Sequence, residues 1–166
     1  MADFPHAVIG ISLTVEGVGY IGSVDAFKAP EIVEKTTDYR GGLVAGRNVF
    51  VGYEPPEAEF RLNREDVTLA AARAIVGRDV VLTFRATLDE KGRRIPVQWI
   101  IYGRVWSTES NDVKPGEMVE KTYKVAVEKF VKTIGGKPAE AFDIANGELK
   151  LSDHSVLEQV RQQLGL

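Results

Sequence analysis

The chain contains no cysteine among its 166 residues. Disulfide bonds, thiol nucleophiles and thiolate metal sites are therefore excluded, and the composition fits synthesis in a reducing compartment. Histidine is nearly as scarce, since the chain carries only His6 and His154. No spacing of histidines or carboxylates around either residue resembles a metal site. We therefore expect neither a bound metal ion nor another cofactor.

The sequence also lacks an excess of basic residues and any long apolar run. Its 21 Lys and Arg residues stand against 24 Asp and Glu residues, a net charge of −3, which disfavours tight electrostatic binding to nucleic acid. The first ten residues, MADFPHAVIG, lack the basic region and long apolar stretch of a secretory signal peptide. No apolar segment approaches the roughly 18 residues of a membrane helix. We expect a protein that is made and kept in a cytoplasm.

The chain is instead rich in the alternation of apolar and polar residues that is typical of half-buried strands. Its length is that of one ordinary domain, so we expect a single domain over residues 1–166. Many strands with short turns predict an antiparallel barrel or sandwich. The pattern predicts seven or eight strands, chiefly over residues 9–15, 20–24, 31–39, 57–62, 79–88, 95–106, 118–132 and 139–146.

Two helices are predicted beside these strands. The first covers about residues 64–76, with Asn63 as its N-cap and Gly77 at its end. The second covers about residues 153–164 and is followed by Gly165. Because the strands do not alternate with helices, a parallel nucleotide-binding sheet is disfavoured. The fold class expected is mainly β with flanking helices.

The segment YRGGLVAGRNVF, residues 39–50, is rich in glycine and raises the question of a phosphate-binding loop. Gly41 and Gly46 have the spacing of a P-loop, but Arg47 and Asn48 stand where Lys and Ser or Thr are required. Residues 48–53 also read as a strand rather than as the helix that would hold the phosphate. The glycines therefore indicate a backbone turn or the close approach of another chain.

Two further groups of residues have a catalytic and a structural interpretation. Ser152 and Ser155 flank His154, but such neighbours at a helix entrance are typical of capping residues rather than of a catalytic dyad. Glu57 and Glu59 share one face of a strand and resemble the carboxylate pair of a hydrolase. Glycosidase carboxylates normally come from separate elements, so a solvated strand face is the simpler interpretation.

The segment IPVQWIIYGRVW, residues 95–106, is apolar on both faces. A strand at the surface of a barrel normally has one polar face, so Ile100, Tyr102 and Trp106 need cover from the middle helix or from another chain. Trp99 lies on the opposite face, so the aromatic residues form no single platform for stacking bases or sugars. We expect Ile100, Tyr102 and Trp106 to form a subunit interface.

Several segments follow one another in a characteristic order along nearly the whole chain. They are the YRGGLVAG segment with Pro30 and Lys35 before it, the segment YGRVWSTESNDVKPGEMVEKTYKVAV, the turn at 135–137, the Phe-Asp-Ile at 142–144, and the closing VLEQVRQQLGL with Arg161. In these segments the sequence resembles the major tail tube proteins of contractile-tailed bacteriophages.

The resemblance implies a non-enzymatic structural protein with a small β-barrel or sandwich and a flanking helix. Such subunits form hexameric rings that stack into a hollow tube, whose lumen conducts DNA without binding it specifically. The implied partners are a tail sheath protein, a tape measure protein, the baseplate and a tail terminator. The implied location is the virion, after synthesis in the host cytoplasm.

A long loop of these proteins reaches the adjacent ring, and the glycine segment matches that loop by position. The resemblance therefore implies inter-ring contacts by Tyr39, Arg40, Gly41, Gly42, Gly46, Arg47 and Phe50.

Three alternatives remain open at the level of sequence. The same subunit would serve a headless contractile device, such as an R-type bacteriocin or a secretion machine. A ligand- or sugar-binding β-barrel would need a concave pocket around Trp99 or Trp106. A hydrolase would need Glu57 and Glu59 to act together on one substrate.

Overall fold

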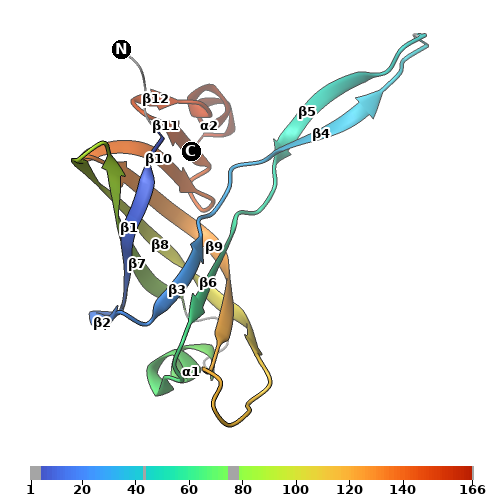
Figure 1. Ribbon diagram of the computed structural model, residues 1–166. Helices are drawn as coiled ribbons and strands as arrows, with labels where there is room; N and C mark the ends of the chain where they lie inside the picture. The colour runs from blue at the N-terminus through green and yellow to red at the C-terminus, as the bar shows by residue number, and fades with distance from the viewer. Residues whose placement is uncertain (1–4, 43, 75–78, 166) are drawn as a thin grey trace.

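The structure is a computed structural model that describes residues 5–42, 44–74 and 79–165, and it consists mainly of antiparallel strands (Figure 1). The predicted fold class, mainly β with flanking helices, is confirmed. The described elements are, in chain order, β1 (Ala7–Val15), β2 (Val18–Ile21), β3 (Val24–Lys28), β4 (Glu34–Tyr39), β5 (Arg47–Tyr53), β6 (Glu57–Leu62), α1 (Val67–Ala74), β7 (Val80–Glu90), β8 (Arg93–Ser110), β9 (Lys121–Ile134), β10 (Lys137–Asp143), β11 (Glu148–Leu151), β12 (His154–Ser155) and α2 (Glu158–Leu164).

Ten of these strands form one sheet that curves into a barrel. The main path runs β12-β11-β10-β9-β8-β7-β1-β2, and β3 joins it through β6, which pairs with β9. The long strand β9 pairs with β6 along its first half, with β10 along its second half and with β8 on its other side. Because β1 also approaches β3, six strands surround one interior in the order β1, β7, β8, β9, β6, β3.

The barrel interior is filled by the apolar side chains that alternate along these strands. Phe84 of β7 stacks on Phe27 of β3 with ring centroids 3.8 Å apart, and Phe60 of β6 stacks on Tyr123 of β9 at 5.0 Å. The second pair lies on neighbouring strands, whereas the first joins β3 to β7, which do not pair with each other, so that one core extends across the barrel. Burial of apolar surface is the main driving force for this arrangement. The fully buried large side chains are Leu13, Val15, Tyr20, Phe60, Leu62, Leu69, Val80, Leu82, Phe84, Ile101, Phe130 and Leu149.

Helix α1 closes one end of the barrel, where its Leu69 is fully buried in the core. Asp66 caps the helix, because its Oδ1 accepts hydrogen bonds from the backbone N–H groups of Thr68 and Leu69 at 2.8 and 3.3 Å. The same oxygen accepts a hydrogen bond from the Tyr20 hydroxyl at 2.7 Å. The cap therefore fastens the helix to the β1–β2 hairpin.

The predicted start of this helix is wrong. The N–H of Asn63 donates to the carbonyl of Ser23 at 2.9 Å, which continues the pairing of β3 with β6, and the capping hydrogen bonds go to Asp66 instead. The helix begins only at Val67, and the predicted end at Gly77 lies outside the described residues.

Strands β4 and β5 form a hairpin that stands away from the barrel, here called the arm (residues 34–53) (Figure 1). All six residues of β4 are exposed. At its base, the Tyr53 ring packs edge-on against Phe142 of β10. The N–H of Glu54 donates to the carbonyl of Val33 at 2.8 Å and joins the two segments that lead into the arm. The arm thus gains almost no burial within its own chain.

The C-terminal region differs from the prediction in two ways. The predicted last strand, β10, is followed by β11 and β12; with β5 and with two strands, β2 and β3, in place of one at 20–24, the described residues contain twelve strands rather than seven or eight. Leu151 pairs with His154 across a tight turn, which keeps residues 153–155 out of the helix and delays α2 to Glu158. Neither helix in the described ranges is long and apolar enough to span a membrane.

Candidate assembly surfaces

The glycine segment forms the tip of the arm, and its geometry serves a turn. Gly41 and Gly42 adopt φ values of +46° and +80°, in the left-handed region that favours glycine. A Cβ atom on Gly41 would lie 2.5 Å from the Tyr39 ring. The tip is followed by β5 and not by a helix, so it offers no helix N-terminus to a phosphate. The interpretation of this segment as a turn is confirmed.

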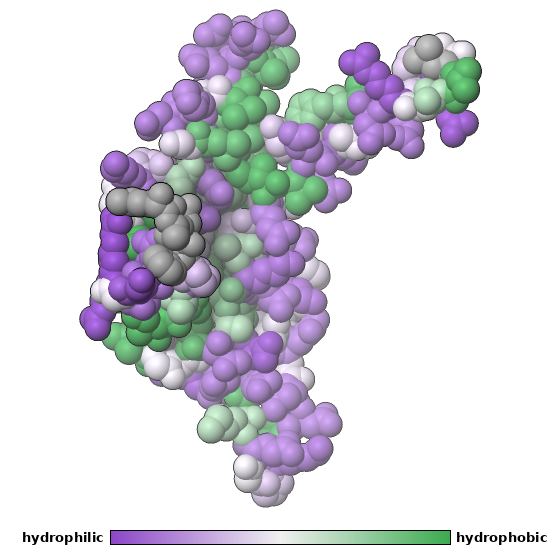
Figure 2. Space-filling model, turned by 45° about the horizontal axis from the view of Figure 1, so that its top comes forward, coloured by the Kyte–Doolittle hydropathy of each residue, from purple (hydrophilic) through white to green (hydrophobic). Residues whose placement is uncertain are grey.

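The structure brings the seven predicted loop residues together on the arm and leaves them exposed. Tyr39 is 60% exposed at the end of β4, and Arg40 and Arg47 flank the tip without an ion pair among the described residues. Phe50 lies further down β5, opposite Thr36 and edge-on to Tyr53. Figure 2 shows hydrophobic surface both along the arm and at its tip.

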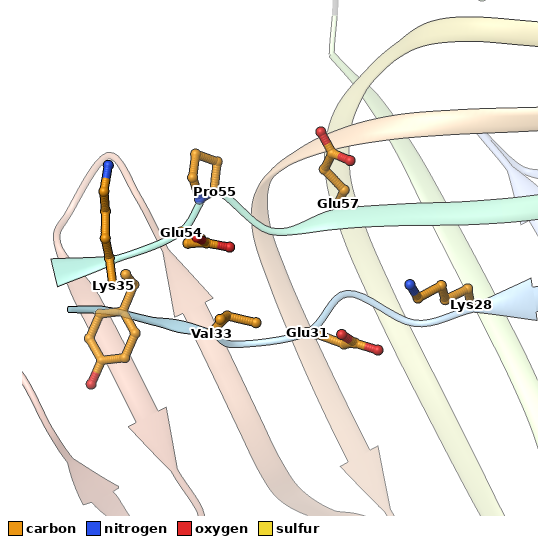
Figure 3. Close-up of a pocket in the computed structure, with 8 residues that line it drawn as sticks. Lys28, Glu31, Val33, Lys35, Glu54, Pro55 and Glu57 are labelled. Carbon is orange, nitrogen blue, oxygen red and sulfur yellow. The ribbon is translucent and has the colours of Figure 1, made fainter. Parts of the chain in front are cut away.

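A hollow of about 460 Å³ lies beside the base of the arm, where extended segments link β3 to β4 and β5 to β6. Figure 3 shows that its side chains fan out along both segments and do not converge on one point. Burial and the carboxylate of Glu34 raise the pKa of the Tyr53 hydroxyl here. The charged lining is spread over Lys28, Glu31, Lys35, Glu54 and Glu57.

Glu57 and Glu59 both lie on the outer face of β6, as the alternation predicts. Glu59 stands between Lys28 of β3 and Lys124 of β9 in the strand register. The pKa of Lys124 is raised chiefly by its hydrogen bond from Nζ to Glu109 at 2.9 Å, with smaller contributions from Glu59 and Glu57. The two glutamates thus belong to a field of alternating charges across three strands.

The histidines remain apart from each other and from any acidic cluster. His6 lies 3.9 Å from Glu90 at the start of β1, and His154 lies in the short strand β12. Ser152 and Ser155 flank His154 in a strand turn rather than at a helix entrance, so their predicted capping role is wrong. Among the described residues, no three His, Cys, Asp or Glu side chains are grouped so as to hold a metal ion.

Strand β8 has two apolar faces, as predicted, one toward the core and one on the outside of the barrel. Trp99 packs against the core with its ring edge-on to Phe27. Ile100 and Tyr102 lie on the outer face, beside Val81 of β7. Helix α1 packs at the end of the barrel and leaves Tyr102 39% exposed.

Trp106 occupies a separate place on β8. It is the extra residue of a β-bulge between Val105 and Ser107, and it is 45% exposed. Its side chain lines a shallow hollow of about 340 Å³ with Lys28, Glu57 and other residues of β6 and β9. The outer face of β8 therefore carries two separate patches, one with Ile100 and Tyr102 and one with Trp106.

Several strand edges have no partner in the part of the chain that the structure describes, and two of them border the same group of strands. β7 pairs with β8 only as far as Gly103, so the segment 104–110 of β8 pairs with β9 alone. β3 pairs with β6 alone. These edges bound the four strands β3, β6, β9 and β8. Sequence reasoning missed them, because a strand's neighbours cannot be read from its own alternation.

The comparisons with known proteins agree with this architecture. The family described as phage tail tube protein FII matches residues 5–165. The tail tube protein of Escherichia phage P2 is 26% identical over 169 residues, which cover 98% of each chain.

Among solved structures, the chain resembles a component of the sheath–tube complex of an extracellular contractile injection system. The TM-score is 0.61 at 11% identity, over 78% of this chain and 92% of the other. A type six secretion system protein is similar with a TM-score of 0.55 at 14% identity, over 84% and 98% of the two chains. At these identities, the likeness establishes the fold. The chain therefore belongs to the phage tail tube protein FII family and is a structural subunit of a tail tube.

Proposed function

We propose that this chain forms hexameric rings that stack into the inner tube of a contractile phage tail, whose lumen conducts DNA during ejection. The observation that carries the proposal is the arm, a two-stranded hairpin whose β4 residues are all exposed. An isolated hairpin of this kind is marginally stable in water at best. Its exposed apolar side chains gain cover only when another subunit packs against them.

Ring closure follows from two of the unpartnered strand edges. Segment 104–110 of β8 and strand β3 bound the same four strands, and pairing one with the other between neighbouring subunits joins these strands into a continuous wall. A contact between two different surfaces is heterologous, so it closes into a ring when the rotation allows. It also removes exposed sheet edges that would otherwise template aggregation.

The apolar patches of β8 complete the contacts within the ring in this proposal. Trp106 lies on the segment whose edge is free, so a neighbouring subunit would cover its exposed ring. Ile100 and Tyr102 lie further along the outer face and provide a second patch for a neighbour. Aromatic side chains are enriched at such interfaces because they bury a large area with few rotatable bonds.

Stacking of the rings is assigned to the arm, through Tyr39, Arg40, Gly41, Gly42, Gly46, Arg47 and Phe50. The net charge of −3 suits a lumen that passes DNA without binding it specifically. The proposed partners are a surrounding tail sheath protein, a tape measure protein, the baseplate and a tail terminator. The proposed location is the virion after synthesis in the host cytoplasm, and the proposed role involves no catalysis.

A second candidate is the same tube subunit in a device without a DNA-filled head. The similarity in fold to a tube of an extracellular contractile injection system and to a type six secretion system protein favours this candidate. The family match and the relative from phage P2 favour the phage tail. Neighbouring genes for a capsid and a terminase would distinguish the two.

Light scattering over a concentration series tests ring formation. We expect a mass of six chains or multiples of it, and we expect Trp106→Lys to shift the protein toward monomer by placing a charge in the ring contact. Leu164→Lys is the matched control, because Leu164 is 68% exposed on α2, outside the segments of the proposed contacts. A strict monomer at high concentration would argue against the proposed function.

A further inference from the structure

The loop between β8 and β9, residues 111–120, is a preformed protrusion (here the β8–β9 loop). Asn111 fixes its neck, because its backbone N–H donates to the Glu120 carbonyl at 3.2 Å and its side chain bonds the Met118 carbonyl and the Glu120 N–H at 2.9 and 3.0 Å. A turn forms its end, where the Glu117 N–H donates to the Lys114 carbonyl and Gly116 adopts a φ of +87°.

This loop presents an acidic and apolar surface to solvent. Val113 and Met118 are each 77% exposed. Asp112 and Glu117 are exposed and make no ion pair with another described residue. By contrast, the neighbouring Glu109 and Glu120 pair with Lys124 and Arg61. Lys114 in the same loop is also exposed, so Asp112, Lys114 and Glu117 together leave a net negative charge beside apolar side chains that the chain itself leaves uncovered.

The tip of the arm has the opposite charge and the same apolar character. Arg40 and Arg47 are exposed and unpaired among the described residues, while Val44 is fully exposed and Tyr39 is largely so. Asp38, which precedes Tyr39 on β4, is also exposed, so the tip carries a net positive charge where the loop carries a net negative one, and each surface supplies two exposed apolar side chains. Opposite charge favours correct encounter of two such surfaces, and apolar burial holds them once they meet.

The two surfaces lie at opposite ends of the molecule, so one subunit cannot satisfy itself. Figure 1 shows the tip of the arm at the upper end and the β8–β9 loop at the lower end of the barrel. β4 alone extends the arm by about 20 Å, at roughly 3.3 Å per residue. A contact between the tip and the loop must therefore join two copies head to tail, and such a contact propagates along an axis.

We propose that the arm tip of one subunit docks on the β8–β9 loop of a subunit in the next ring. Arg40 and Arg47 pair with Asp112 and Glu117, and Tyr39 and Val44 pack against Val113 and Met118. This inference rests on the proposed ring-stacking function and identifies the surface that receives the arm. Because the partners have opposite charge, the contact also makes every ring stack with the same polarity.

A charge-swap experiment tests this pairing. We expect Arg40→Glu with Arg47→Glu, and separately Asp112→Arg with Glu117→Arg, to form rings but raise the protein concentration needed for tubes by about tenfold or more, because like charges then face each other. The four changes together restore the opposite charges and should restore tube formation. Lys137→Glu with Asp153→Arg is the control, since both residues are exposed outside the two surfaces.

The outcomes separate this inference from the proposed function. If wild-type protein forms neither rings nor tubes, the proposed function fails and the inference fails with it. If wild-type tubes form and Asp112→Arg with Glu117→Arg leaves tube formation unaffected, the inference alone is wrong. The same conclusion follows if the four changes together do not restore tube formation. Thermal unfolding of each variant identifies any change that has damaged the barrel itself.

Cross-linking gives a second test that does not depend on charge reversal. The chain has no cysteine, so Val44→Cys with Met118→Cys introduces the only two thiols. A disulfide requires the two Cα atoms to approach within about 7 Å. Mild oxidation of tubes should give ladders of linked subunits that isolated rings do not give. Absence of ladders from well-formed tubes would overturn the proposed pairing.

Discussion

At the scale of single residues, Asp66 connects the start of helix α1 to Tyr20 of β2, a contact that the neighbouring sequence does not indicate. Burial raises its pKa, but hydrogen bonds from Tyr20, Arg64 and the backbone of Thr68 and Leu69 outweigh burial and lower the pKa to about 2. Burial, assisted by the same Asp66 contact, raises the pKa of Tyr20 to about 12. Tyr20 therefore remains protonated at neutral pH, where it donates to Asp66.

We predict that Asp66→Ala lowers the free energy of unfolding by about 2 kcal/mol at pH 7, because the cap is lost and the Tyr20 hydroxyl loses its acceptor. A depressed folded pKa stabilises the fold above the unfolded pKa of about 3.8, and this contribution is lost as the pH falls through about 2. Urea unfolding of both proteins should therefore show a gap that narrows between pH 4 and pH 2.

Asn63→Ala is the matched control, with an expected change within about 0.5 kcal/mol. A larger effect of Asn63 than of Asp66 would contradict the assignment of the cap. Sequence reasoning placed the cap at Asn63. It could not identify Asp66 as the cap, because the position of Asp66 depends on its contact with Tyr20, which lies 46 residues away in the chain.

At the scale of elements, the residues that shape the tip of the arm are distinct from those that stabilise the barrel. Its tip needs glycine at Gly41 and Gly42, whereas the arm contacts the core only at its base, through Tyr53. Ordering the tip against another subunit costs roughly 1–2 kcal/mol of backbone entropy per residue. New contacts with that subunit must offset this cost.

We predict that Gly41→Val with Gly42→Val blocks the stacking of rings and leaves the thermal unfolding of the barrel nearly unchanged. Valine is strained at positive φ, and its side chain on Gly41 would collide with the Tyr39 ring. Tube formation and the melting temperature should be measured on the same preparation. If the variant formed normal tubes, the arm would not be the inter-ring contact. If the barrel of the variant unfolded, the glycines would be required for the fold rather than for assembly.

Most elements of this fold could be predicted from alternation, but their partners could not. The outward Glu57 and Glu59 on β6 and the inward Trp99 on β8 follow directly from a period of two. The bulge at Trp106 does not, because it depends on the register with β9. The helix predicted from Asp153 began late for a similar reason, since pairing of Leu151 with His154 overrode local helix signals.

At the scale of the whole molecule, the chain is incomplete as a monomer in three places. The arm is uncovered, segment 104–110 of β8 and strand β3 have free edges within the described ranges, and β8 has an exposed outer patch. The resemblance to the tail tube proteins implies the exposed arm, and the apolar pattern of residues 95–106 implies the patch, whereas the free edges follow only from the strand pairing. That residues 1–166 act as a single domain remains a prediction.

Electron microscopy of the purified, negatively stained protein tests the central claim most directly. The account predicts rings with sixfold symmetry and, at higher concentration, hollow tubes built from stacked rings, with no other protein present. Particles the size of a single chain at every concentration, with neither rings nor tubes, would contradict it.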